Sequence, residues 1–180
     1  MDIVRDRLLA GEKLLWSGQP SQGLLLTARD GLLIPFSLMW GGFAVFWESS
    51  VWRANAPLGF RLWGVPFVLV GLYFVLGRFA LDAWLRGRTW YAVTDRRILI
   101  ARPGFLGRLV ALDRDRLPEM SLEERPDGRG TIRFGTEVPI WGRGGFGGWT
   151  PSLDPVPRFL AIEDARAVFD RIQAAVPRRA

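Results

Sequence analysis

The chain has 180 residues, enough for one ordinary domain and a small appendage. It contains no cysteine and no histidine, which excludes thiol nucleophiles, disulfides, Ser-His-Asp triads and nearly every zinc or haem site. The net charge is +6, but the arginines that supply it are mixed with 18 acidic residues and form no uniform basic stripe. This charge pattern predicts topology determinants and solvated faces, with no nucleic acid as a partner.

The N-terminal segment, residues 1–30, contains one strand candidate. In "GEKLLWSGQP" (11–20), Leu14 and Trp16 lie on the same face, and Pro20 closes the strand. We expect residues 12–19 to pair with a sheet formed much later in the chain. The apolar segment between them would then be an insertion into that domain.

Two uncharged apolar runs dominate residues 31–81. They cover about 31–47 and 62–81, if the second run continues past Arg78 with this side chain snorkelling at its end. A membrane-spanning helix needs roughly 20 apolar residues, with a range of about 17–25. Pro35 and Pro66 would fall within about the first turn of each span, where a missing backbone donor costs least. The pattern predicts a transmembrane helical hairpin, because the rest of the chain is too short to cover two buried helices.

The charges flanking the runs predict their orientation. The linker 48–61 carries Arg53 and Arg61, offset by Glu48. Five arginines follow close behind the second run: Arg78, Arg86, Arg88, Arg96 and Arg97. By the positive-inside rule, both termini face the cytoplasm and the linker faces outward. The first run starts too late, behind mixed charges, for a cleavable signal peptide.

The pattern changes to short strands and turns over residues 85–180. Three strand candidates come first, at 89–95, 96–102 and 108–113, and two more at 119–125 and 130–135 flank a turn with Asp127-Gly128. Strands at this spacing predict an all-β sheet or a small barrel.

The chain ends in a predicted amphipathic helix at about 163–176. Its apolar residues fall on one face: Ala165, Val168, Phe169, Ile172 and Val176. Such a helix, following a sheet, is expected to cover the sheet's open end. The predicted fold class is therefore α+β, with a transmembrane hairpin inserted near the N-terminus of the β domain.

The segment "YAVTDRRILI" carries a short signature at Tyr91, Thr94, Asp95 and Arg97. Together with two preceding spans and "GEKLLWSGQP", it resembles the membrane-anchored bacterial pleckstrin-homology-like family, long catalogued as a domain of unknown function. The resemblance implies a bent β-barrel capped by a C-terminal helix, at the cytoplasmic face of a bacterial inner membrane. It also implies a capacity for self-association into rings, and neither cofactors nor catalytic residues. From the residues alone, Thr94 and Asp95 either bond backbone groups in their turn or take part in binding.

A glycine-rich stretch, "GRGGFG" (142–147), matches a dinucleotide-binding pattern by its letters. That motif must open a helix, and the two prolines in the following "GWTPSLDP" exclude one. The same region carries Trp141, Phe146 and Trp149. These aromatic side chains either contact a partner or the membrane interface, or pack into the barrel.

Three functions remain compatible with these features. The favoured one is a non-enzymatic, membrane-anchored binding or scaffold module, with the lipid bilayer, a membrane or cytoplasmic protein, or further copies of the chain as partners. The others are an anionic-lipid sensor and an accessory subunit of a membrane enzyme or transport complex. Arg86, Arg88 and Arg96 are predicted to contact the membrane surface, setting orientation without forming a specific headgroup pocket.

Overall fold

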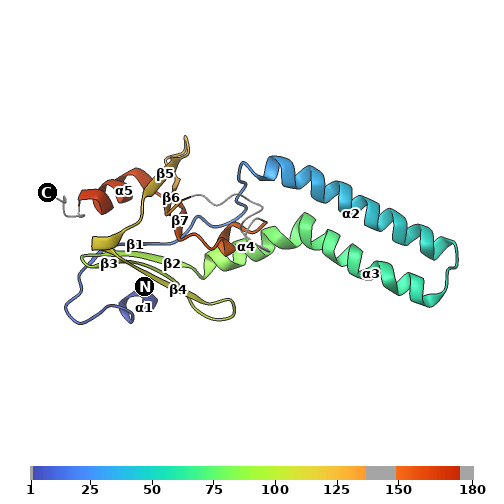
Figure 1. Ribbon diagram of the computed structural model, residues 1–180, viewed down its shortest axis with the longest axis horizontal. Helices are drawn as coiled ribbons and strands as arrows, with labels where there is room; N and C mark the ends of the chain where they lie inside the picture. The colour runs from blue at the N-terminus through green and yellow to red at the C-terminus, as the bar shows by residue number, and fades with distance from the viewer. Residues whose placement is uncertain (1, 137–148, 175–180) are drawn as a thin grey trace. The chain divides into compact units, whose positions relative to one another are not determined.

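The computed structural model describes residues 2–136 and 149–174 (Figure 1). The chain forms two compact units. The sheet unit comprises Met1–Gly23 and Ala83–Ala180, and the hairpin unit comprises Leu24–Asp82.

The hairpin unit consists of two long apolar helices. α2 covers Asp30–Arg53 and α3 covers Leu58–Leu72. A π-helical stretch, Tyr73–Gly77, follows, and then α4, Arg78–Gly87. The helical segments Asp30–Arg53 and Leu58–Gly87 are both long and apolar enough to cross a membrane, which weakly indicates membrane association. Both are longer than the apolar runs predicted from the sequence.

Small residues line the contact between α2 and α3. Ser37 and Ala44 on α2 are buried, and so are Gly64 and Gly71 on α3. A Cβ atom at Gly71 would lie 2.9 Å from the Cα atom of Gly41, so the two backbones approach closely. The large apolar side chains consequently point away from the partner helix. The most exposed are Leu32, Met39, Phe43, Phe46, Leu58, Phe60, Trp63 and Leu76.

Two expectations for this unit were wrong. Both prolines lie inside helices, because α2 and α3 begin before the uncharged runs do; Pro66 is well beyond the first turn of α3. Arg78 does not snorkel. It is 2% exposed and forms an ion pair of 2.7 Å with Asp30, whose other carboxylate oxygen accepts hydrogen bonds from the backbone and hydroxyl of Thr27. A buried guanidinium is tolerated when a carboxylate compensates its charge.

The first sheet of the sheet unit is antiparallel, with the order β1-β2-β3-β4. Its strands are β1 (Leu14–Gly18), β2 (Trp90–Thr94), β3 (Arg97–Arg102) and β4 (Arg108–Asp113). Trp16 lies opposite Val93, and Gly18 lies opposite Tyr91. The predicted pairing of residues 12–19 with the later sheet is thereby confirmed. The hairpin unit is inserted in sequence between two neighbouring strands.

The second sheet contains β5 (Met120–Glu124), β6 (Gly130–Phe134) and β7 (Arg158–Ile162). Gly128 has φ +76° in the predicted turn between β5 and β6, a conformation that suits glycine. Short 3₁₀ helices at Arg114–Arg116 and Pro151–Leu153 lie in the connections. β7 was not predicted from the sequence, because "FLAI" is uniformly apolar and closely follows two prolines, so it shows no alternation.

One hydrophobic core joins both sheets to the last helix, α5 (Ala165–Ala174) (Figure 1). Its buried members come from β2, β3, β6, β7 and α5: Tyr91, Val93, Ile98, Ile100, Ile132, Phe134, Phe159, Ile162, Ala165, Val168 and Ile172. Phe169 packs against this core as predicted, whereas Val176 lies outside the described residues. The structure is thus α+β, with two antiparallel sheets.

The other face of the first sheet is also covered. Val4 from the short helix α1 (Asp2–Arg5) packs on Ala92 and Leu99. Because both faces of the first sheet are covered, every residue of β2 and β3 is buried except the first residue of each strand. Because β1 pairs with β2, the turn between β2 and β3 lies next to the N-terminal segment. This turn carries most of the sequence signature.

Candidate functional site

The hydroxyl of Thr94 organises the β2–β3 turn. It accepts hydrogen bonds from the backbone N–H groups of Arg97 at 2.9 Å and Arg96 at 3.2 Å. It also donates to Oε1 of Glu12 at 2.7 Å. Thr94 is fully buried, so its hydroxyl serves the turn and the N-terminal segment together.

Glu12 is the central acceptor of this network. Its side chain is buried and receives Nε of Arg97 at 2.9 Å, Nη2 of Arg97 at 3.0 Å and the backbone N–H of Leu9 at 2.7 Å. Burial alone would raise the pKa of Glu12. The hydrogen bonds from Arg97, Leu9 and Thr94, with the charge of Arg97, outweigh burial and lower this pKa to about 2. Glu12 is therefore a carboxylate at neutral pH.

Asp95 adds a second link to the N-terminal segment. Its carboxylate accepts the backbone N–H of Lys13 at 2.9 Å, and its own N–H donates to the Lys13 carbonyl at 3.0 Å. Nη1 of Arg114 donates to the Asp95 carbonyl at 3.1 Å. The three signature residues Thr94, Asp95 and Arg97 thus join residues 7–13 to the first sheet. We call Glu12, Thr94, Asp95 and Arg97 the turn network.

Glu12 was missed by sequence reasoning. The available signal was its position as the first residue of the segment 12–19, which was predicted to pair with the later sheet. The pairing was predicted, but its register was not, so no contact between Glu12 and Arg97 could be inferred.

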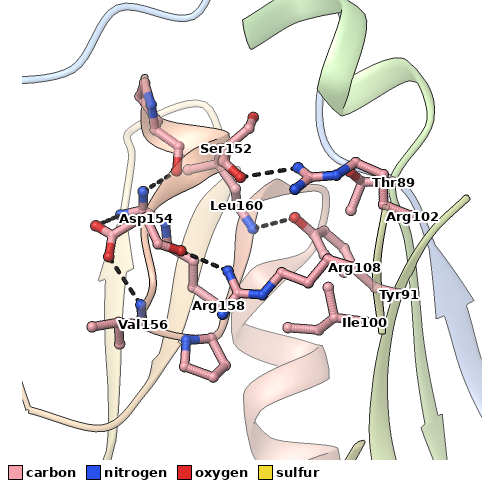
Figure 2. A pocket seen from close by; sticks show the side chains of 12 residues that line it. Thr89, Tyr91, Ile100, Arg102, Arg108, Ser152, Asp154, Val156, Arg158 and Leu160 are labelled. Atoms are coloured by element: carbon pink, nitrogen blue, oxygen red, sulfur yellow. Dashed lines mark hydrogen bonds and ion pairs between the residues drawn. The ribbon is translucent and has the colours of Figure 1, made fainter. Parts of the chain in front are cut away.

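A second polar cluster lies at the opposite end of the first sheet, in a small pocket (Figure 2). Arg102 at the end of β3 donates to the Ser152 carbonyl at 3.0 Å. Arg108 at the start of β4 donates to the Asp154 carbonyl at 2.7 Å, and Arg158 forms an ion pair of 3.2 Å with the buried carboxylate of Asp154. We call Arg102, Arg108, Asp154 and Arg158 the arginine cluster. The pocket's free volume is about 30 Å³, room for one or two waters.

The turn network and the arginine cluster both lie in a chain whose sequence matches a known protein family. The family model described as "Bacterial PH domain" matches residues 35–176, which include most of the hairpin unit, β2 to β7 and α5. The chain belongs to this family. A search of curated proteins found no match, and a search of solved structures found none either.

The PH domain match begins after β1, so Glu12 lies outside the matched residues while Thr94, Asp95 and Arg97 lie inside them. Tyr91, the remaining signature residue, is not part of the turn network. Its ring stacks on Phe159 with centroids 4.6 Å apart, and its hydroxyl accepts the backbone N–H of Leu160 at 3.1 Å beside the pocket (Figure 2). Its contacts are with the core and with β7.

The arginines predicted to contact the membrane surface do not form one group in this PH domain. Arg86 is 1% exposed and donates to the backbone carbonyls of Ser21 and Gly23, so the prediction of a headgroup contact for this side chain is corrected. Arg88 is exposed, with its guanidinium over the ring of Trp84 at 3.9 Å. Arg96 is also exposed, but it lies beyond the far end of β2. Five strand residues span about 16 Å, so Arg88 and Arg96 lie at opposite ends of the sheet.

The predicted aromatic contact residues are only partly described. Trp141 and Phe146 lie outside the described residues, and Trp149 is half-buried next to the buried Thr150. Among residues 2–136 and 149–174, no group of three or more Asp or Glu side chains is placed to hold a metal ion.

Proposed function

We propose that this bacterial PH domain protein is a non-enzymatic binding or scaffold module anchored in a bacterial inner membrane. One observation carries the proposal: α2 and α3 pack through small residues and expose their large apolar side chains. Phe43, Phe46 and Trp63 are 66%, 68% and 67% exposed. Water would disfavour such a surface, whereas lipid accommodates it without cost.

The orientation proposed is two spans with both termini in the cytoplasm. Between the helices, the connection near Asn55 carries little net charge, since Arg53 and Arg61 are offset by Glu48. The segment after α3 is strongly basic. The positive-inside rule places that basic segment, and with it the sheet unit, on the cytoplasmic side.

The sheet unit is proposed to be a bent barrel closed by α5. The shared core between both sheets supports this, and so does a link from the chain after β1 to β7, where the N–H of Ser21 donates to the Ala161 carbonyl at 2.9 Å. A closed barrel with buried faces would offer its loops and strand edges for binding. The partners proposed are the bilayer, a membrane or cytoplasmic protein, and further copies of the chain.

A non-enzymatic role is supported by the way the polar side chains are used. In the turn network, Glu12 and Thr94 bond to each other, to Arg97 and to backbone groups. In the arginine cluster, the guanidinium groups donate to carbonyls of residues 151–155. Groups engaged in this way stabilise a scaffold; a nucleophile or general base instead needs access to a substrate.

The alternative, an anionic-lipid sensor, is favoured by one observation: three arginines converge on a single pocket. A phosphate there would have to compete with backbone carbonyls for the guanidinium donors. Selective binding of full-length protein to vesicles with one anionic headgroup, lost in Arg108→Gln, would support the sensor. Equal binding to vesicles with different anionic headgroups of the same charge supports the scaffold.

Topology is the direct test of the anchored module. Reporter proteins fused after Gly23, Asn55 and Asp127 should read cytoplasmic, external and cytoplasmic. A cytoplasmic reading at Asn55 contradicts the two-span anchor. Cross-linking of the full chain in native membranes then identifies the bound protein or a second copy of the chain. The variant Asp127→Lys serves as a surface control.

A further inference from the structure

The turn between β3 and β4 presents an apolar surface to its surroundings. Phe105 is 81% exposed, Leu106 41% and Leu109 55%. Val110 and Leu112, by contrast, pack against the core, so Leu109 faces away from it. We call Phe105, Leu106 and Leu109 the apolar tip.

The apolar tip is held in place by a tightly built turn. Gly104 has φ +86°, and the N–H of Gly107 donates to its carbonyl at 2.8 Å. A Cβ atom at Gly107 would lie 2.7 Å from that carbonyl oxygen, so only glycine fits there. Nε of the buried Arg102 donates to the Leu106 carbonyl at 2.9 Å. The arginine cluster therefore supports the apolar tip from inside the sheet unit.

Leu106 adopts an unfavourable backbone conformation. Its φ is +59°, in the left-handed region, which costs a residue with a Cβ atom about 1–2 kcal/mol. Glycine or asparagine would relieve most of that cost. The leucine side chain is largely exposed, so it returns little packing energy to the fold. An exposed leucine in a strained turn points to a role outside the sheet unit.

The charges around the apolar tip are basic. Residues 103–107 of the turn carry no charge, and the half-buried Arg108 follows them, whereas Arg102 is buried and donates to backbone carbonyls. Trp90 pairs with Ala101, so the start of β2 lies at the same end of the first sheet, and the exposed Arg88 precedes it. Apolar side chains surrounded by basic ones are typical of segments that dip into an anionic membrane interface.

A bilayer fits this surface better than a protein partner does. The chain reaches β2 from α4, which is the last part of the apolar helical segment Leu58–Gly87. The end of the sheet that carries the apolar tip is thus the end at which the chain arrives from its proposed membrane span. Trp84 and Arg88, stacked on each other just before β2, are residue types enriched at membrane interfaces.

We propose that Phe105 and Leu106 insert into the interfacial layer of the anionic cytoplasmic leaflet, giving the sheet unit a second attachment to the membrane and a defined orientation. This inference rests on the proposed membrane anchor. It assigns the membrane contact to the apolar tip. Arg86 and Arg96, which were predicted from the sequence to contact the membrane surface, are not part of that contact.

The test uses the full chain, which has no cysteine of its own. Three single-cysteine variants, Phe105→Cys, Leu38→Cys and Asp127→Cys, carry an environment-sensitive fluorophore in vesicles of phosphatidylcholine and phosphatidylglycerol. Nitroxide-labelled lipids act as quenchers. A label about 5–10 Å below the surface should lose roughly half its intensity to shallow nitroxides, which is the expectation for Phe105→Cys. Leu38→Cys should respond to deep nitroxides, and Asp127→Cys to neither.

The outcomes separate the two proposals. Quenching at Leu38→Cys without quenching at Phe105→Cys overturns the insertion and leaves the anchor intact. Absence of quenching at both overturns both. Quenching at Phe105→Cys alone supports insertion and contradicts the anchor. Protection of Phe105→Cys from a polar thiol reagent in native membranes but not in pure lipid would overturn insertion in favour of a protein partner.

A second variant controls for the fluorophore. Leu106→Asn should fold, because asparagine tolerates the left-handed conformation. In the Phe105→Cys background it should reduce the quenching by shallow nitroxides. Unchanged quenching would show that the fluorophore itself sought the lipid, and would overturn the proposal.

Discussion

The two ends of the first sheet use arginine side chains in different ways. At the β2–β3 turn, Arg97 bonds to Glu12, a carboxylate 85 residues away in sequence, and the contact joins the N-terminal segment to the sheet. At the other end, Arg102, Arg108 and Arg158 donate mainly to backbone carbonyls of one connection, residues 151–155. The first arrangement joins the N-terminal segment to the sheet through a buried carboxylate, while the second ties the backbone of a single connection to the sheet. Substitutions at the two ends should therefore have global and local effects respectively.

The largest effect is expected for Arg97→Ala in the turn network. It leaves the buried carboxylate of Glu12 without its cation, and breaking such a pair costs about 3 kcal/mol. The melting temperature of the purified full chain should fall by several degrees. Arg96→Ala is the matched control, because Arg96 is adjacent and exposed; its melting temperature should stay near that of the parent. Equal losses in both variants would contradict the distinction.

The pH dependence of stability should also depend on Glu12. Its pKa is lowered from 4.5 to about 2 on folding, so the carboxylate stabilises the fold fully above pH 4.5. That contribution is lost as the pH falls from 4.5 towards 2. Melting temperature measured across this window should drop steeply in the parent chain. Glu12→Gln should start lower and fall less steeply; a curve parallel to the parent's would assign the acid sensitivity to other carboxylates.

Thr94→Val should have a smaller effect at the same end. The substitution keeps the shape but removes the hydroxyl that donates to Glu12 and accepts from two backbone N–H groups. Losing these partners should cost about 1–2 kcal/mol, seen as a lower melting temperature. Thr94→Ser retains the hydroxyl and should recover most of the loss. If serine does no better than valine, side-chain packing rather than hydrogen bonding governs this position.

The smallest global effect is expected for Arg108→Gln at the other end. Arg108 holds only residues 154 and 155 of one connection and neutralises no buried carboxylate, so the melting temperature should hardly change. Amide hydrogen exchange at Ser152, Leu153 and Asp154 should accelerate about tenfold, the factor that corresponds to about 1.4 kcal/mol of local opening. Arg166→Gln is the control, since Arg166 pairs with Glu124 on the surface. A large global loss in Arg108→Gln would erase the contrast between the two ends.

Periodicity and composition in the sequence were sufficient to predict much of the architecture. The strand candidates at 89–95, 96–102 and 108–113, the Asp127-Gly128 turn and the helical face from Ala165 onward depend on local chemistry, and the corresponding elements are present. The two apolar helices and the family followed in the same way, from hydropathy and a short signature. β7 was not predicted, because an evenly apolar strand that closely follows two prolines has no local pattern to distinguish it.

Tertiary structure alone decided which charged groups meet. Glu12, Arg97 and Thr94 come together because β1 pairs with β2 in one particular register, and no periodicity encodes that register. Arg86 was assigned to the membrane surface from its sequence position, yet it is buried against the carbonyls of Ser21 and Gly23. A long polar side chain can turn towards solvent or towards unpaired backbone groups, and only the packed fold determines which of these it reaches.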